Sequence, residues 1–170
     1  TQAIITVPAG KDVLAGHSII IAVRTNNTGT YTVSDSVGNS YSTDVLGGSN
    51  PNVAIISAHN VKALPAGGSI TMRFNDTFSQ TSVISVIEFA GIKCSGAKDR
   101  VAGTNSSSNS PNSGNTLTTN QADEISFGVI GLAATPTLSG VQAGYTQTGT
   151  VVNGNTKIYP MYRIESAMGA

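Results

Sequence analysis

Hydrophobic and polar residues alternate with a period of two along most of the chain, and clusters of Gly, Pro, Asn and Ser separate the alternating runs. Such alternation is typical of β-strands that pack one face against a core, and no long run has the period of an amphipathic helix. Regularly spaced turn clusters are typical of sandwiches and barrels. We therefore predict an all-β fold, a single-domain antiparallel β-sandwich of immunoglobulin-like or jelly-roll type with about nine or ten strands. The expected strands span residues 3–7, 18–25, 30–34, 40–45, 53–58, 69–74, 82–89, 124–132, 145–152 and 157–164.

Three of these segments are almost continuously apolar, namely 18–23 (SIIIAV), 82–89 (SVISVIEF) and 125–132 (ISFGVIGL). A continuous apolar run indicates a strand covered on both faces, so we expect these strands at the centre of the sheets or at subunit contacts. The most polar segment, 103–119 (GTNSSSNSPNSGNTLTT), is expected to form a flexible loop that projects from one end of the sandwich. The length suits one domain, which we place at 1–170.

Residues 31–41 (YTVSDSVGNSY) place two short alternating runs on either side of a turn cluster. Asp35, Gly38 and Asn39 are residue types that accept a positive φ or hydrogen-bond to nearby backbone, so the segment predicts a β-hairpin or a tight β-corner. A calcium site built from Asp35, Asn39 and Asp44 is the alternative, because calcium binds carboxylate and amide oxygens. The segment lacks the alternating acidic positions of a dedicated calcium loop, so a structural turn is the favoured interpretation.

Charged residues make up 11% of the chain, the formal net charge is zero, and the nine Lys and Arg residues are scattered singly. A nucleic-acid partner would need a clustered basic patch, so we expect none. A surface of hydroxyl and amide groups is common in secreted β proteins, and we expect an extracellular, cell-surface or virion-surface location. No apolar run is long enough to cross a bilayer. The chain enters strand-like sequence directly after Thr1, as expected of a mature product or of an expressed fragment.

Residues with catalytic or metal-binding chemistry are few. His17 and His59 are too far apart in sequence for a standard metal pair, and the single cysteine, Cys94, cannot form an intrachain disulfide. A thiolate pair between Cys94 and His59 is the alternative, and no local motif supports it. No GxSxG, HExxH or phosphate-binding glycine motif is present. We therefore expect no catalytic residue, metal or cofactor, and predict that the protein is not an enzyme.

Glu88 is a carboxylate inside the apolar run VISVIEFAGI. A buried carboxylate has to be paired, protonated or placed at a sheet end. We predict a buried acid that pairs with a strand arginine, Arg24, Arg73 or Arg163. The alternative is that Glu88 assists an intramolecular cross-link between a Lys and an Asn.

Three Asn-X-Ser/Thr sequons begin at Asn26, Asn75 and Asn105. All three fall at predicted strand ends or in loops, where a glycan is tolerated, so they are candidate glycosylation sites. Asp123 and Glu124 precede a predicted strand and are candidates to share a cation with another loop.

Several segments together carry a resemblance that spans nearly the whole chain. The pattern VPAG…AGHSIIIAV, TVSDSVGNSYSTDV, SVISVIEFAGI…KDRVAGT, TLTTNQADEISFGVIG and YPMYRIESA resembles a β-sandwich module that recurs in secreted and surface proteins of bacteria, archaea and some phages. Its most specific residues are Asp35, Gly38, Asn39, Tyr41, Glu88, Phe89 and Gly91. The resemblance implies a fold and a non-catalytic role, with these residues serving the structure.

The chain departs from that pattern at both ends, where a further upstream strand and a last apolar strand are expected. A sheet that lacks a terminal strand exposes unpaired N–H and C=O groups, which a neighbouring chain can fill. The segment 1–9 (TQAIITVPA) is apolar and uncharged. We predict that its residues Ala3, Ile4, Ile5 and Val7 are donated to a neighbour, as in donor-strand complementation.

The predicted function is that of a structural subunit of an extracellular assembly: a pilus-like filament, a surface layer or a virion decoration. Its partners would be copies of itself, because head-to-tail contacts that do not close build filaments. The alternative is a carbohydrate-binding or adhesion module of a larger secreted protein, with surface glycans as partners. The absence of Trp and the presence of only five Tyr weigh against that alternative, because sugar platforms use aromatic faces.

Overall fold

The computed structural model describes residues 1–26, 30–47, 52–75, 81–105, 107–133 and 137–169. Within these ranges the chain forms strands and loops and no helix, so the predicted all-β fold is confirmed, and no helix is present that could span a membrane. The strands are β1 (Gln2–Thr6), β2 (Ser18–Thr25), β3 (Tyr31–Asp35), β4 (Ser42–Gly47), β5 (Asn52–Ala58), β6 (Ser69–Phe74), β7 (Ser82–Phe89), β8 (Glu124–Leu132), β9 (Thr146–Gln147), β10 (Val151–Asn153) and β11 (Thr156–Glu165).

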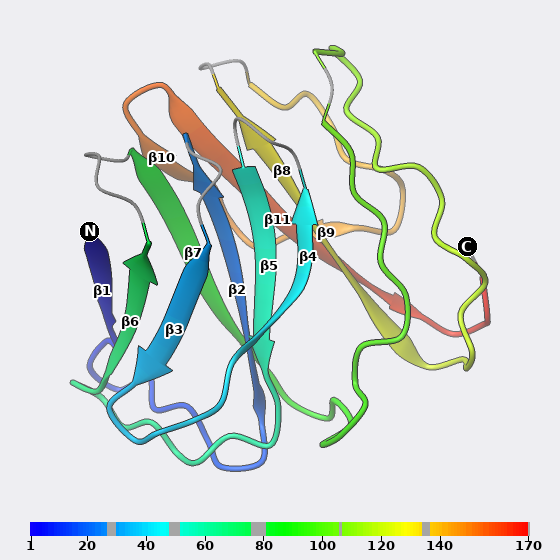
Figure 1. Ribbon diagram of the computed structural model, residues 1–170. Coiled ribbons are helices and arrows are strands. Elements are labelled where there is room, and N and C mark those ends of the chain that lie inside the picture. The colour runs from blue at the N-terminus through cyan, green and yellow to red at the C-terminus, as the bar shows by residue number, and fades with distance from the viewer. Residues whose placement is uncertain (27–29, 48–51, 76–80, 106, 134–136, 170) are drawn as a thin grey trace.

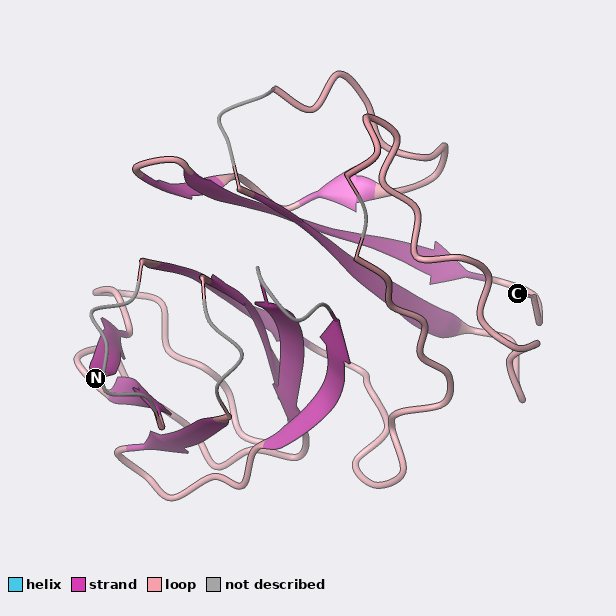
Figure 2. Cartoon of the chain, turned by 45° about the horizontal axis from the view of Figure 1, so that its top comes forward, coloured by secondary structure: helices cyan, strands magenta, loops and turns pink. Residues whose placement is uncertain are grey.

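The strands form three antiparallel sheets (Figure 1). The first sheet has the order β1-β6-β3, the middle sheet β4-β5-β2-β7, and the third sheet β10-β11-β8 with β9 paired to β11. Figure 2 shows the first and middle sheets facing each other, while the third sheet crosses the other side of the middle sheet at an oblique angle. The fold is therefore a two-sheet sandwich with a third sheet packed against the outer face of the middle sheet.

The main core lies between the first and middle sheets. Ile19, Ile21 and Val23 alternate along β2 and pack with Ile56 of β5 and Met72 of β6. Each of these five side chains is at most 2% exposed. Burying a side chain of this size contributes about 1.5–3 kcal/mol, so this cluster is the principal stabilising feature of the sandwich.

The opposite face of β2 is covered by the third sheet. Ala22 of β2, Val83 of β7 and Ile158 of β11 form a second buried cluster, against which Phe127 and Val129 of β8 pack. All eight residues of β2 are buried as a result. The prediction that the apolar run 18–23 is covered on both faces is confirmed.

β7 and β8 lie at the edges of their sheets, so of the two predicted alternatives the central position is wrong for both, and a place at subunit contacts stays a prediction. The side chains of β7 still contact two layers, since Val83 packs in the second cluster while Ile84 and Val86 pack against the main core. A continuous apolar run thus indicates cover by two layers and does not fix a central position.

The segment between β3 and β4 is a corner between two sheets. β3 pairs with β6 in the first sheet, whereas β4 pairs with β5 in the middle sheet. Of the two predicted alternatives the hairpin is therefore wrong and the β-corner is correct. The turn residues guide the chain from one layer to the other.

Two further predictions need correction. The expected strand 145–152 is two short strands, β9 and β10, which both pair with β11. The described residues of the polar loop 103–119 form no strand, as expected, but the loop runs along the flank of the sheets and does not project from one end (Figure 1). Its base is tied down because Arg100 Nε donates a hydrogen bond of 3.0 Å to the carbonyl of Thr118.

Candidate functional site

The corner is organised by the carboxylate of Asp35. Its Oδ1 accepts hydrogen bonds from the backbone N–H groups of Val37 and Asn39, both at 3.0 Å. Its Oδ2 accepts from Asn39 Nδ2 at 2.7 Å and from the Tyr41 hydroxyl at 2.9 Å. Asn39 in turn accepts a hydrogen bond from the backbone N–H of Lys62, beyond β5, at 2.7 Å. One carboxylate thus fixes the corner and connects it to the next loop.

This network shifts two pKa values. Burial raises the pKa of Asp35, but the hydrogen bonds from Asn39, Tyr41 and Val37 together outweigh burial, so the pKa lies below its ordinary value. Burial raises the pKa of Tyr41, and the hydrogen bond to Asp35 and the negative charge of Asp35 raise it further. Since all four donors already occupy Asp35, its carboxylate is a structural group, as the sequence predicts, and the calcium alternative lacks free oxygen ligands there.

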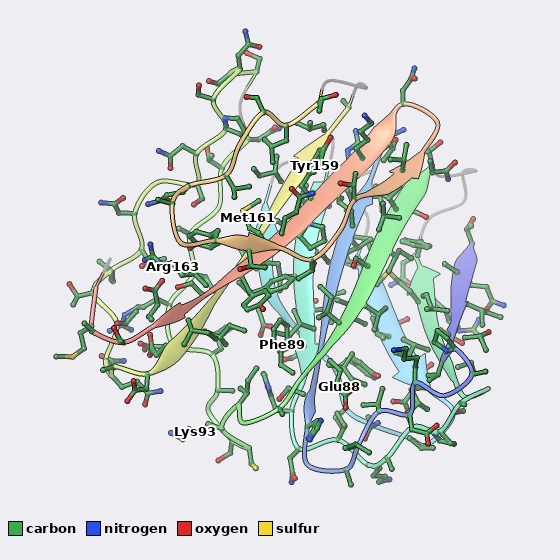
Figure 3. The ribbon with its side chains drawn as sticks, turned by 180° about the vertical axis from the view of Figure 1, so that it is seen from behind. Glu88, Phe89, Lys93, Tyr159, Met161 and Arg163 are labelled. Carbon is green, nitrogen blue, oxygen red and sulfur yellow. The ribbon has the colours of Figure 1, made fainter. Side chains whose placement is uncertain are left out.

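Glu88 is exposed, so the prediction of a buried acid is wrong. It is the penultimate residue of β7, near the end of this edge strand of the middle sheet (Figure 3). Its Oε1 accepts hydrogen bonds from His17 Nδ1 at 2.7 Å and from the backbone N–H of Leu14 at 2.8 Å. The side chain that contacts Glu88 is therefore a histidine just before β2, not an arginine.

The arginines proposed as partners of Glu88 lie elsewhere. Arg24 is 1% exposed and donates from Nη1 to Thr156 Oγ1 at 2.7 Å, between the middle and third sheets. Arg163 donates from Nε to Glu165 Oε1 at 2.6 Å, on the third sheet, and Arg73 is exposed on β6. The hydrogen-bond partners that the structure gives Glu88 include neither a Lys nor an Asn side chain, so nothing supports the cross-link alternative.

The remaining candidate residues are dispersed. Cys94 is exposed, and His59 Nδ1 hydrogen-bonds to Ser18 Oγ at 2.8 Å. The side chains of Asn26, Asn75 and Asn105 are exposed, as a glycan would require, although each sequon includes a residue outside the described ranges. Across the described residues, no three His, Cys, Asp or Glu side chains come together to hold a metal ion.

Glu124 lies beside a carboxylate that the sequence does not indicate, Asp99. Burial raises the pKa of Glu124, and a hydrogen bond to Asp99 and its negative charge raise it further. Hydrogen bonds from Asn120 and the charge of Arg100 hold the pKa of Asp99 below its ordinary value. Asp99 also accepts hydrogen bonds from the backbone N–H of Asn120 at 2.6 Å and from Asn120 Nδ2 at 2.5 Å, so this carboxylate connects the segment before the loop 103–119 to the segment after it.

A cleft of about 1120 Å³ opens where the middle and third sheets diverge. Ile20, Ile55 and Ser57 of the middle sheet line one side, and Ile125 and Phe127 of β8 line the other. The rim is polar and includes Asp44, His59, Asp99, Arg100 and Glu124. We call this space the inter-sheet cleft.

Ser57 is the most informative polar residue of the inter-sheet cleft. It is 2% exposed, and within the described part of the chain its Oγ has no hydrogen-bond partner. A buried hydroxyl without a partner costs free energy unless another group satisfies it. The wall of the cleft is therefore largely apolar and contains one buried hydroxyl whose hydrogen-bonding capacity is not used within the described residues.

Among the strands that the structure describes, only β6 pairs with β1, so β1 forms an open edge of the first sheet (Figure 1). It pairs with β6 from Gln2 opposite Arg73 to Thr6 opposite Ser69, without a register shift. The strand is uncharged, and Ile4 on its outer face is 59% exposed. Natural edge strands are usually protected by charges, prolines or bulges, and β1 has none of these.

The residues predicted to be donated have a place within their own chain. Ala3 packs against the main core and Val7 is 7% exposed within it. Donation would break the β1 and β6 pairing in one copy and remake it in another. Addition of a strand at the outer edge of β1 leaves that pairing intact.

A second edge, that of β4, shows the protection that β1 lacks. The pairing of β4 with β5 shifts between Thr43 and Val45, which is a bulge, and Asp44 supplies a charge at that point. Bulges and charges both discourage a further strand from pairing. β1 is therefore the better surface for pairing with another chain.

Comparison of the chain with protein-family models, with curated proteins and with solved structures gave no match. The resemblance to a surface β-sandwich module stays a hypothesis.

Proposed function

We propose that the protein is a non-catalytic structural subunit of an extracellular assembly, in which copies of the chain join by β-strand addition. The observation that carries the proposal is the open edge of β1: five residues, no charge, no bulge, and an isoleucine that is 59% exposed. Unpaired N–H and C=O groups on a flat, uncharged edge favour pairing with another strand. A pilus-like filament, a surface layer and a virion decoration are the assemblies that fit a chain with this neutral, hydroxyl-rich surface.

Two matched substitutions test this proposal. Ile4→Lys places a charge on the open edge and is expected to abolish association through β1, because a charged edge disfavours strand addition. Leu14→Lys changes an aliphatic side chain that is 55% exposed, close to the 59% of Ile4, but lies outside the strands, and it is expected to leave association unchanged. Light scattering coupled to size exclusion, with negative-stain microscopy, measures the outcome. A wild-type protein that stays monomeric at every concentration would rule the proposal out.

A second candidate function, a carbohydrate-binding or adhesion module, is favoured by the inter-sheet cleft. Its apolar interior and its polar rim, which includes His59 and Asp44, suit a ligand with apolar and hydroxyl faces, and a pocket of this kind is the usual place for a ligand. Affinity electrophoresis through gels that contain neutral polysaccharides tests it. His59→Gln is expected to weaken any retardation at least several-fold, whereas His17→Gln, outside the cleft, serves as the matched control.

A further inference from the structure

The hydrogen bonds at both ends of β1 determine which of its backbone groups face outward. The N–H of Phe74 donates to the carbonyl of Thr1 at 2.9 Å, and the N–H of Val7 donates to the carbonyl of Gly68 at 2.8 Å. In an antiparallel pair, hydrogen-bonded positions alternate with positions whose N–H and C=O point the other way. Thr1 and Val7 are odd positions, so Ala3 and Ile5 also bond to β6. The outward groups therefore belong to Gln2, Ile4 and Thr6.

The length of this outward edge is limited. The next even position is Pro8, which has no N–H to donate and whose carbonyl already accepts a hydrogen bond from the Lys11 N–H at 3.1 Å, so a partner strand gains little beyond Thr6 at that end. The side chains of Gln2, Ile4 and Thr6 all lie on the exposed face of the first sheet. The same three residues thus supply the free backbone groups and the outer face of the edge.

A second copy of β1 is the partner that fits this edge best. Two uncharged strands meet without repulsion between like charges. β1 and β3 are both antiparallel to β6, so they run parallel to each other. If the copies were related by translation, β1 of one copy would therefore meet β3 of the next copy in a parallel pair. Antiparallel pairs are more common and slightly more stable, and a two-fold axis between two β1 strands produces one.

Counting hydrogen bonds selects the register. An axis at Ile4 pairs Ile4 with Ile4 and Gln2 with Thr6, so all three outward residues of each strand are used, and three pairs with two bonds each give about six. Among the residues of β1 alone, an axis at Ala3 pairs only Gln2 with Ile4 and an axis at Ile5 pairs only Ile4 with Thr6, so either gives about four. The axis at Ile4 also sets each exposed isoleucine beside its symmetry mate.

From these constraints we infer that two copies of the chain pair through β1 in a two-fold, antiparallel register centred on Ile4. The first sheets of the two copies then form one continuous sheet with the strand order β3-β6-β1-β1-β6-β3. Such an interface is isologous and closes on itself, so the dimer is the unit from which a larger assembly would be built through a different surface. This inference rests on the proposed function and specifies the contact by which two copies of the chain first join.

Cysteine cross-linking tests the register. In a background that carries Cys94→Ser, Ile4→Cys places two cysteines in a hydrogen-bonded pair with Cα atoms about 5.5 Å apart, which lies within the range of disulfides. The single variants Gln2→Cys and Thr6→Cys put like cysteines four residues out of register, about 14 Å apart, too far to join. A mixture of these two variants brings Gln2→Cys opposite Thr6→Cys.

After mild oxidation, Ile4→Cys is expected to give a covalent dimer on a non-reducing gel, and neither edge variant alone should do so. The mixture of the two edge variants should give a covalent heterodimer. If Ile4→Cys associates under reducing conditions and does not cross-link when oxidised, the register is wrong while the proposed function stands. If the wild type does not associate at all, the proposed function and this inference both fall.

Discussion

At the scale of single residues, Asp35 and Glu88 are two carboxylates near strand ends with opposite environments. Asp35 accepts four hydrogen bonds inside a partly buried corner, whereas Glu88 lies on an exposed strand end beside His17. Hydrogen bonds to a charged group stabilise more when solvent does not compete for them. The two residues should therefore contribute very differently to stability.

Removing the Asp35 carboxylate should destabilise the fold strongly. Asp35→Ala leaves the N–H groups of Val37 and Asn39 and the Tyr41 hydroxyl without their acceptor, and the free energy of unfolding is expected to fall by about 3 kcal/mol. Glu88→Ala is the matched control, with an expected loss below about 1 kcal/mol because the pair is solvated. Urea denaturation measures both. Equal losses would contradict the structural role of the corner.

The lowered pKa of Asp35 predicts a pH dependence with a definite sign. Its folded-state pKa lies below the unfolded value of about 3.9, so its stabilisation is complete above that pH and is lost as the pH falls through the folded-state pKa. The stability gap between the wild type and Asp35→Asn should be constant near neutral pH and shrink below about pH 4. Urea denaturation at stepped pH tests this, and a gap that persists to the lowest pH at which both proteins fold would refute it.

At the scale of elements, the alternation of residues locates strands accurately. Four strands, β2, β6, β7 and β8, have the predicted bounds, because turn residues mark both ends of each apolar run. The prediction is wrong at 145–152, where β9 and β10 replace one strand. Pairing with β11, a distant segment, decides which residues there count as strand.

The corner also requires a glycine at one position. Gly38 has φ +74°, a conformation that residues with a Cβ rarely adopt, although an added Cβ would lie 3.7 Å from Lys62 Nζ without a clash. Gly38→Ala is therefore expected to cost about 1–2 kcal/mol through backbone strain alone. Gly140→Ala, at a position without a positive φ and with no atom within 4 Å of the added Cβ, should be neutral or slightly stabilising. Thermal unfolding of the two variants compares them, and a neutral Gly38→Ala would show that the corner relaxes.

At the scale of the whole molecule, the third sheet approaches the middle sheet closely at one glycine, Gly131. A Cβ added at Gly131 of β8 would overlap Val53 Cγ2 of β5 and lie 3.1 Å from Arg24 Cγ. At Gly128 of the same strand, the nearest atom to an added Cβ is Met161 Cγ at 3.5 Å, an ordinary contact. Gly131 is thus a point where the two sheets approach closely.

Gly131→Ala should push the third sheet away from the middle sheet. The expected cost is about 1–3 kcal/mol, as for overpacking in a core, and Gly128→Ala should cost less than about 1 kcal/mol. Hydrogen exchange measured by mass spectrometry should show faster exchange in β8 and β11 of the Gly131 variant and little change in β6. Uniformly faster exchange across all sheets would show that the third sheet does not open separately.

The sequence by itself determined the class of the fold, the position of most strands and the structural character of Asp35, Gly38 and Asn39, because alternation and turn chemistry are local properties of the chain. Only the tertiary structure decided that the corner joins two sheets, that β7 and β8 are edge strands, that Glu88 is exposed beside His17, and that a cleft opens at Ser57. The reason is that strand pairing is a contact between distant segments, and a period of two identifies a strand without identifying its neighbour. The open edge of β1 depends on both the sequence and the tertiary structure. The sequence shows that the strand is uncharged, whereas the structure shows that β1 pairs with β6 on one side only.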